Sequence, residues 1–217
     1  MQEDYTHITA VLDRSGSMAT INKATVDGFN TFLESQKKEK GKATLTLIGF
    51  DDRYEVWRDF LPIQQVDPLV DLGPRGWTAL HDAMGKAITE TGAALESLPI
   101  SERPAKVLVL IMTDGMENAS KEFNADSVSK LVSHQKEKYL WEFTYIGANQ
   151  DAILTAKSLG IGPQAAMNYA ANSQATANTF KNLTRGTSTL RAASANMRGK
   201  SLQYFEEERR SSMVPDK

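Results

Sequence analysis

The sequence predicts an α/β protein with a doubly wound, mostly parallel sheet and helices on both faces. Three observations carry this prediction. Short apolar, β-branched runs alternate with segments of helical periodicity over residues 6–169, which is the pattern of βαβ units. One run, residues 106–112, is apolar almost throughout, as expected for a central strand that is covered on both faces. Two neighbouring runs are separated by the short polar segment 51–53, which favours a hairpin and one antiparallel strand at a sheet edge.

The first half of the chain supplies a strand, a helix, a hairpin and a second helix. Residues 6–12 are predicted to form a buried strand that ends in a polar turn, and residues 21–36 form a helix with one apolar face. The strands of the hairpin are residues 43–50 and 54–61. Apolar side chains spaced by threes and fours over residues 79–98 predict a long amphipathic helix.

The second half repeats this alternation after the central strand. Residues 127–139 are predicted to be helical, and residues 141–146 to form a strand. A short helix over residues 151–159 is closed by Gly160, and residues 166–169 are expected to form a last short strand.

The remaining residues differ in composition from the rest of the chain. Residues 173–205 are rich in Ala, Ser, Thr and Asn, so we expect a weakly anchored helical segment with breaks at Gly186 and Gly199. We therefore divide the chain into an α/β domain, residues 1–170, and a C-terminal helical extension, residues 171–217, that packs on the domain or extends from it.

The amino-acid composition excludes several kinds of site. The chain of 217 residues has no Cys, so a disulfide framework, a zinc finger, an iron–sulfur cluster and a thiol nucleophile are excluded. Its three His residues are scattered and form no HExxH-like pair. A metal must therefore be held by oxygen atoms or by very few imidazoles.

Charge and hydropathy bear on location. A net charge of −2 and a hydrophobic content of 41% are typical of a soluble globular protein, and they argue against a wholly basic nucleic-acid binder. No apolar run approaches the roughly 20 residues of a membrane span, and no cationic stretch precedes the first apolar run. We expect a cytoplasmic protein with no membrane association, located in the host cytoplasm if it is encoded by a phage.

The near-zero net charge conceals an uneven distribution. Residues 152–205 contain no Asp or Glu, which leaves 19 basic residues against 27 acidic ones elsewhere. The six basic residues of this segment are Lys157, Lys181, Arg185, Arg191, Arg198 and Lys200. The segment can dock on the acidic body of the same chain, which we favour, or it can contact an acidic partner; nucleic acid is not expected.

Five oxygen-bearing side chains stand at positions that suit a metal site. Asp13, Ser15 and Ser17 follow the first strand at alternate positions, Thr78 opens a helix, and Asp114 ends the central strand. In doubly wound sheets, ligands bind outside the carboxyl ends of the strands. Two carboxylates and three hydroxyls are hard ligands that suit Mg²⁺, Mn²⁺ or Ca²⁺. Alone, an Asp in this position can equally be a helix cap or a turn residue.

These motifs resemble those of the von Willebrand factor A (VWA) domain with a complete metal-ion-dependent adhesion site. The motifs are Asp13-Arg14-Ser15-Gly16-Ser17, Thr78 within Gly76-Trp77-Thr78-Ala79-Leu80, and Asp114 within Thr113-Asp114-Gly115. The resemblance covers roughly residues 4–170 and implies a six-stranded, mostly parallel sheet. It implies that Ser15, Ser17 and Thr78 are direct or near-direct ligands, and that Asp13 and Asp114 bind directly or through water. Residues 145–151 (YIGANQD) resemble a segment of small bacterial and phage proteins of this class.

Other polar residues near the predicted strand ends have simpler interpretations. Asp51 and Asp52 are expected to be turn residues rather than a second cation site. Asn149 and Asp151 are expected to cap the helix that follows them, although both can also border the metal site.

Two residues near Thr78 in the sequence, Trp77 and His81, carry aromatic rings. Trp77 can be a contact for a partner or can pack under its loop, and the sequence favours neither. His81, one helical turn after Thr78, is expected to be a surface or capping residue rather than a metal ligand.

The function that we expect is that of a non-enzymatic, divalent-metal-dependent protein-binding module. The bound Mg²⁺-type ion keeps an open position that an Asp or Glu of a partner protein completes. A structural or assembly subunit with a stabilising metal is the alternative. A Mg²⁺-dependent phosphoester hydrolase is the third possibility, because Asp13 follows a buried strand, but the second acid that such enzymes need is replaced by Ser15.

Overall fold

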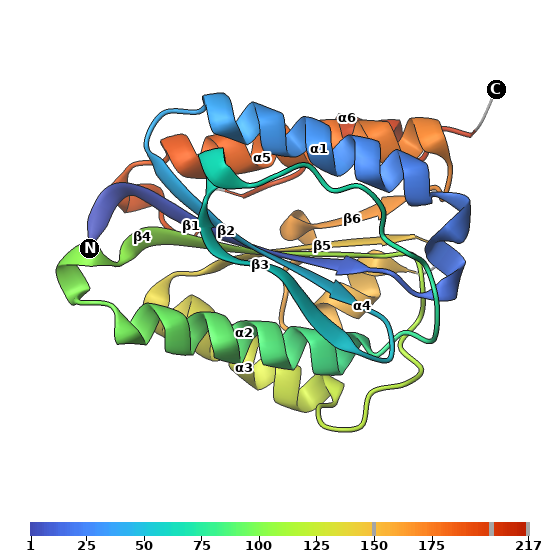
Figure 1. The fold of residues 1–217 in the computed structure, drawn as a ribbon, viewed down its shortest axis with the longest axis horizontal. Coiled ribbons are helices and arrows are strands. Elements are labelled where there is room, and N and C mark those ends of the chain that lie inside the picture. The colour runs from blue at the N-terminus through green and yellow to red at the C-terminus, as the bar shows by residue number, and fades with distance from the viewer. Residues whose placement is uncertain (149–150, 200–201, 216–217) are drawn as a thin grey trace.

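The computed structural model describes residues 1–148, 151–199 and 202–215, and it contains one six-stranded sheet. The strand order is β3-β2-β1-β4-β5-β6 (Figure 1). The strands are β1 (Gln2–Asp13), β2 (Lys42–Phe50), β3 (Tyr54–Pro62), β4 (Pro104–Thr113), β5 (Glu142–Ala148) and β6 (Ala166–Tyr169). All neighbours pair in parallel except β2 and β3, so the predicted mostly parallel sheet with one antiparallel edge strand is confirmed.

The sheet has its switch of strand order at β1. From β1 the chain moves outward to β2 and β3, and it then returns to place β4 on the other side of β1. Parallel pairing brings Leu12 of β1 level with Met112 of β4, so the two central strands end side by side. Both strands are buried from Ile8 and Val107 to their last residues, as expected where helices cover both faces.

Helices cover both faces of the sheet. In Figure 1, α1 and α5 lie on one face, while α2 and α3 lie on the other. The helices are α1 (Asn22–Lys38), α2 (Leu80–Ser97), α3 (Ala125–Tyr139), α4 (Ala152–Ser158), α5 (Ser173–Ala192) and α6 (Glu206–Ser211). Among the described residues, no helix combines the length and apolar character that crossing a membrane requires.

The helix α5 differs from the sequence prediction. It continues through Gly186 and ends at Ala192, so the expected break at Gly186 is wrong. The described residues between 193 and 205 form only the short 3₁₀ turn Ala195–Met197 in place of the expected helix. Weak anchoring is also wrong, because Phe180 and its apolar neighbours belong to the same core as the sheet. Small residues explain the close packing: a Cβ on Gly28 of α1 would lie 2.2 Å from the Phe180 ring. The division of the chain at residue 170 stays a prediction.

Three basic residues of the acid-free segment bind within the chain. Arg191 donates to the carbonyl oxygens of Gln36 (2.6 Å), Lys40 (3.2 Å) and Gly41 (3.1 Å), where a helix C-terminus carries partial negative charge. Two ion pairs join Arg185 to Glu208 and, at 3.3 Å, Arg198 to Glu3. Arg191 and Arg198 thus dock on the α/β domain of the same chain, whereas Arg185 pairs within the C-terminal extension. Lys200 lies outside the described residues.

A buried histidine, His7, lies in the amino-terminal half of β1. The ring nitrogens of His7 lie 2.8 Å from the Thr44 hydroxyl and 3.1 Å from the Thr9 hydroxyl, and the ring stacks on Phe60. Burial lowers the pKa of His7 from 6.5 to about 3. His7 is therefore neutral in the folded protein over a pH range in which the unfolded chain binds a proton.

This difference predicts an acid-sensitive stability. Because the folded pKa lies below the unfolded one, the contribution of His7 is complete above pH 6.5 and is lost as the pH falls toward 3. In urea unfolding at a series of pH values, wild type should lose up to about 1.4 kcal/mol per pH unit more than His7→Gln between pH 6 and pH 4. Equal pH slopes for the two proteins would contradict this assignment.

Candidate metal centre

The predicted site residues come from three segments at the carboxyl edge of the sheet. Asp13 is the last residue of β1, and Ser15 and Ser17 follow in the loop and short 3₁₀ turn that lead to α1. Asp114 follows the last residue of β4, and Thr78 lies two residues before α2. Since β1 and β4 are neighbours in register, their two carboxylates emerge side by side.

Hydrogen bonds join four of these residues directly. The Ser17 hydroxyl donates to Oδ1 of Asp114 at 2.6 Å and lies 3.1 Å from the Ser15 hydroxyl. The Ser15 backbone N–H donates to Oδ1 of Asp13 at 2.6 Å. Oδ2 of Asp13 accepts from the Thr113 hydroxyl at 2.5 Å. The two loops are thereby linked through the polar atoms of the site itself.

The Thr78 hydroxyl lies close to the Ser17 hydroxyl because residue 115 is a glycine and has no side chain. A Cβ on Gly115 would lie 2.6 Å from Oγ1 of Thr78 and 3.5 Å from Oγ of Ser17. Both hydroxyls therefore pack against the residue that follows Asp114. The structure brings all five predicted side chains together, and their role as metal ligands stays a prediction.

Burial makes the two carboxylates difficult to ionise. It raises the pKa of Asp13 to about 6, against the opposing effect of hydrogen bonds from Thr113 and Ser15, and the charge of Asp114 adds to the increase. Burial also raises the pKa of Asp114. A divalent cation between the two carboxylates would supply the opposite charge that stabilises their ionised forms.

A tyrosine that sequence reasoning missed faces this negative charge. The Tyr169 hydroxyl, at the end of β6, is buried without a hydrogen-bond partner among the described residues. Burial and then the charges of Asp114 and Asp13 raise its pKa well above the usual value. A buried donor that lacks a partner and is influenced by the charges of both carboxylates fits a site that is completed by a hydrated ion.

The donor set limits which metal these residues suit. The described residues contain no group of three or more His, Asp or Glu that could hold a metal. A metal centre here consequently depends on the three hydroxyls as well as on Asp13 and Asp114. This oxygen set fits Mg²⁺, Mn²⁺ or Ca²⁺, and these are the cations that the five residues would hold.

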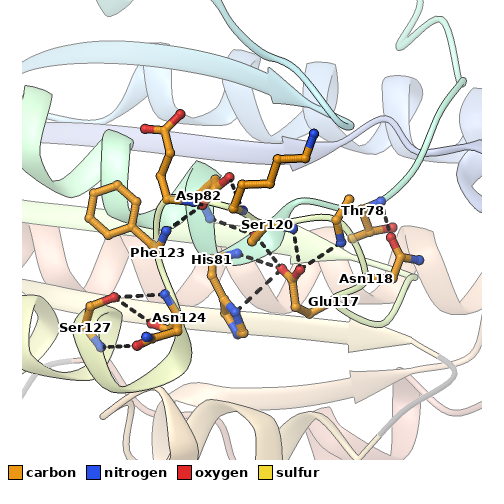
Figure 2. A network of polar contacts seen from close by, with 12 residues as sticks. Thr78, His81, Asp82, Glu117, Asn118, Ser120, Phe123, Asn124 and Ser127 are labelled. Carbon is orange, nitrogen blue, oxygen red and sulfur yellow. Dashed lines mark hydrogen bonds and ion pairs between the residues drawn. The ribbon is translucent and has the colours of Figure 1, made fainter.

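The loop between β4 and α3 is fixed to the start of α2 by contacts that the sequence did not reveal (Figure 2). The Asn118 N–H donates to the Thr78 carbonyl at 3.0 Å, and Oδ1 of Asn118 accepts from the Thr78 N–H at 2.9 Å. This pairing holds the backbone of Thr78 on both sides. Nothing in the spacing of Asn118 from the site motifs signals it.

Two carboxylates add further contacts between the loop and α2, and we call the set of contacts made by Asn118, Glu117 and Asp82 the clamp. Glu117 accepts from the backbone N–H groups of Ser120 at 2.8 Å and His81 at 2.9 Å, so it joins the loop to α2. Asp82 of α2 accepts from three successive N–H groups, those of Lys121, Glu122 and Phe123. The loop that carries Asp114 is therefore positioned relative to the segment that carries Thr78.

The structure also tests what the sequence predicted for the other polar and aromatic residues near the strand ends. The His81 ring lies 3.7 Å from Glu117, within the clamp. Trp77 is 68% exposed, so packing under its loop is wrong. Asp51 is a turn residue, accepting from the Arg53 N–H, and its buried carboxylate also forms an ion pair with the partly exposed Arg75. Asp151 caps α4, and Asn149 lies outside the described residues.

Comparison with known proteins identifies the architecture. Neither protein-family models nor curated sequences match this chain. Among solved structures, a von Willebrand factor type A protein from Catenulispora acidiphila is similar over 85% of this chain and 43% of its own, with a TM-score of 0.56 and 14% identity. The chain has the VWA fold. Whether it is of the small bacterial or phage type stays a prediction.

Other similar solved structures include a thread matrix protein and a pilus adhesin. Proximal thread matrix protein 1 from the mussel byssus, with a zinc-occupied adhesion-site motif, has a TM-score of 0.58 and 15% identity over 86% of this chain and 46% of its own. The pilus adhesin SpaC from Lactobacillus rhamnosus GG has a TM-score of 0.59 and 13% identity over 85% of this chain and 30% of its own. The chain thus spans less than half the length of each of these proteins.

Metal binding should stabilise the fold measurably. Mg²⁺ at about 100 times its Kd should raise the unfolding free energy by ~2.7 kcal/mol, because the ion binds the folded chain alone. Ser15→Ala should weaken binding about tenfold or more, whereas Ser97→Ala, a control on an exposed helix end, should not. Calorimetric titration and urea unfolding provide the measurements.

The same experiment in EDTA separates binding from folding. There, Asp13→Asn should be at least as stable as wild type, because it removes a buried carboxylate charge. A large loss of stability in EDTA would instead mean that Asp13 acts chiefly as a structural hydrogen-bond acceptor.

Gly115→Ala should damage the site with little effect on the rest of the fold. The added Cβ would contact the Thr78 hydroxyl at 2.6 Å and must displace it. We expect about a tenfold loss of Mg²⁺ affinity by calorimetric titration, with an EDTA-state unfolding midpoint close to wild type. Wild-type affinity in this variant would show that Thr78 is not needed for the metal.

Proposed function

We propose that this protein is a non-enzymatic binding module in which Asp13, Ser15, Ser17, Thr78 and Asp114 hold a Mg²⁺-type ion that a partner's Asp or Glu completes. The observation that carries the proposal is the convergence of five oxygen-bearing side chains, two carboxylates and three hydroxyls, at the carboxyl edge of the sheet. Neutral hydroxyl ligands leave the ion more positive than a cage of carboxylates would, which favours an incoming carboxylate. Ser17 is exposed, so the site opens to solvent.

The solved structures support an interaction role. One similar structure is described as a pilus adhesin and another as a thread matrix protein with zinc in its adhesion-site motif. We extend this role to the present chain as part of the proposal, together with a cytoplasmic location.

The surroundings of Asp13 argue against the hydrolase alternative. The residue two positions on is Ser15 rather than a second acid. Turnover of p-nitrophenyl phosphate that requires Mg²⁺ and disappears in Asp13→Asn would overturn the non-enzymatic assignment.

Affinity capture from the native cell tests the proposal. Tagged wild type and Ser97→Ala should retain the same protein in Mg²⁺, and that protein should be lost in EDTA and from Ser15→Ala, because each removes the ion's contact. Mass spectrometry identifies what is retained. A set of captured proteins that is insensitive to both EDTA and Ser15→Ala would contradict metal-dependent binding.

Size-exclusion chromatography separates partner capture from the assembly alternative. If the protein is an assembly subunit, Mg²⁺ should convert the isolated chain to a larger species that EDTA reverses. The binding-module proposal expects the same elution volume in both conditions.

A further inference from the structure

A groove of about 570 Å³ lies beside the candidate metal centre. Its walls are the turn between β2 and β3, the first two turns of α2, and the loop between β4 and α3. Trp77, which immediately precedes Thr78, lines the groove, and so does Asn118, which holds the Thr78 backbone. Ala79, on the other side of Thr78 in the chain, lines it too, so the groove borders the segment that carries one of the predicted ligands.

The walls of the groove are fixed to one another. The Asp82 and Glu117 carboxylates attach the β4–α3 loop to α2, as Figure 2 shows. The turn between β2 and β3 is attached to the start of α2, because the Ala79 N–H donates to the Asp51 carbonyl at 3.0 Å. A groove with such walls needs little ordering when it binds, which favours affinity.

Two large apolar side chains close in sequence to predicted ligands are exposed. Trp77 precedes Thr78 and is 68% exposed, and Met116, two residues after Asp114, is also 68% exposed. Exposed Trp and Met beside a polar site are typical anchors of protein interfaces. They offer contact to an apolar side chain that neighbours a metal-bound carboxylate.

The charges of the groove are unequally paired. Lys86 forms an ion pair with Glu122 at 2.7 Å, and Asp82 is occupied by three backbone N–H groups. Arg53 and Lys121 also line the groove, and neither takes part in an ion pair within the part of the chain that the structure describes. Two acids of the lining, Asp52 and Asp82, are also without an ion pair among the described residues, and the Asp82 carboxylate accepts from the backbone of the β4–α3 loop. Arg53 and Lys121 are therefore the cations of the groove with which a carboxylate of an occupant can pair.

We propose that the groove binds a short acidic segment of the partner protein, with one carboxylate on the metal, an adjacent apolar side chain on Trp77, and a second carboxylate near Lys121 and Arg53. The inference rests on the proposed function, because it assumes a metal that accepts a carboxylate. The inference goes beyond that function by specifying the sequence of the partner segment. A partner segment with a single acid and no apolar neighbour should bind weakly, because the second acid and the apolar side chain provide selectivity.

A random library of 12-residue peptides displayed on phage tests this inference on the full chain. Peptides selected in Mg²⁺ and released by EDTA should share two acids and an apolar residue beside one of them. For the selected synthetic peptide, measured by fluorescence polarisation, Trp77→Ala and Lys121→Glu should each weaken binding about tenfold. Lys130→Glu, the same charge reversal on an exposed position of α3, should change binding less than about twofold.

A second variant of the peptide makes the test specific. Replacing its second acid by the neutral amide should remove most of the effect of Lys121→Glu, because the two groups then no longer interact. Calorimetric titration with Mg²⁺ alone should give the same affinity for Lys121→Glu and wild type.

The outcomes separate the groove from the metal. EDTA-released peptides that bind Trp77→Ala and Lys121→Glu as tightly as wild type would overturn the groove while leaving the metal-dependent function intact. Peptides that are weakened by these two variants but unaffected by EDTA would contradict the metal-dependent function and keep the groove. A selection that yields no EDTA-released peptide, or yields basic peptides, would contradict the acidic-segment inference.

Discussion

The site depends on the side-by-side emergence of two buried carboxylates, Asp13 and Asp114, from the ends of neighbouring parallel strands. The register of β1 and β4 fixes this placement, and burial opposes ionisation of both groups. Such an arrangement is costly unless hydrogen bonds or a cation stabilise the charges. The surrounding hydroxyls and backbone N–H groups supply the former, and the oxygen set as a whole suits the latter.

The rest of the structure holds the third ligand segment in place against this pair. Thr78 belongs to neither strand, so its position relies on Asn118, which pairs with its backbone, and on Gly115, whose missing side chain makes room for its hydroxyl. Glu117 and Asp82 then tie the β4–α3 loop to α2. The same contacts that position Thr78 also join the walls of the neighbouring groove, so the metal centre and the groove depend on one set of hydrogen bonds.

Patterns with strong physical signatures were predictable from the sequence. Buried strands are recognisable as continuous apolar runs, and the motifs around Asp13 and Asp114 could be placed because each follows such a run. The motif around Thr78 could be placed because it precedes an amphipathic helix. The extent of α5 was not predictable, because a small-residue helix looks weakly anchored until Gly28 and Phe180 are seen in contact. The clamp and Tyr169 were missed for a related reason: their roles arise from burial and from contacts distant in sequence, which periodicity does not encode.

The most direct test of the account is a crystal structure of the protein with Mn²⁺, located by its anomalous scattering. We expect a single strong peak bounded by Asp13, Ser15, Ser17, Thr78 and Asp114, with the Tyr169 hydroxyl directed toward a water bound to the ion. A crystal with Mn²⁺ bound elsewhere, and the Asp13 and Asp114 carboxylates joined by a shared proton or by an ordered side chain, would contradict a metal centre at this site.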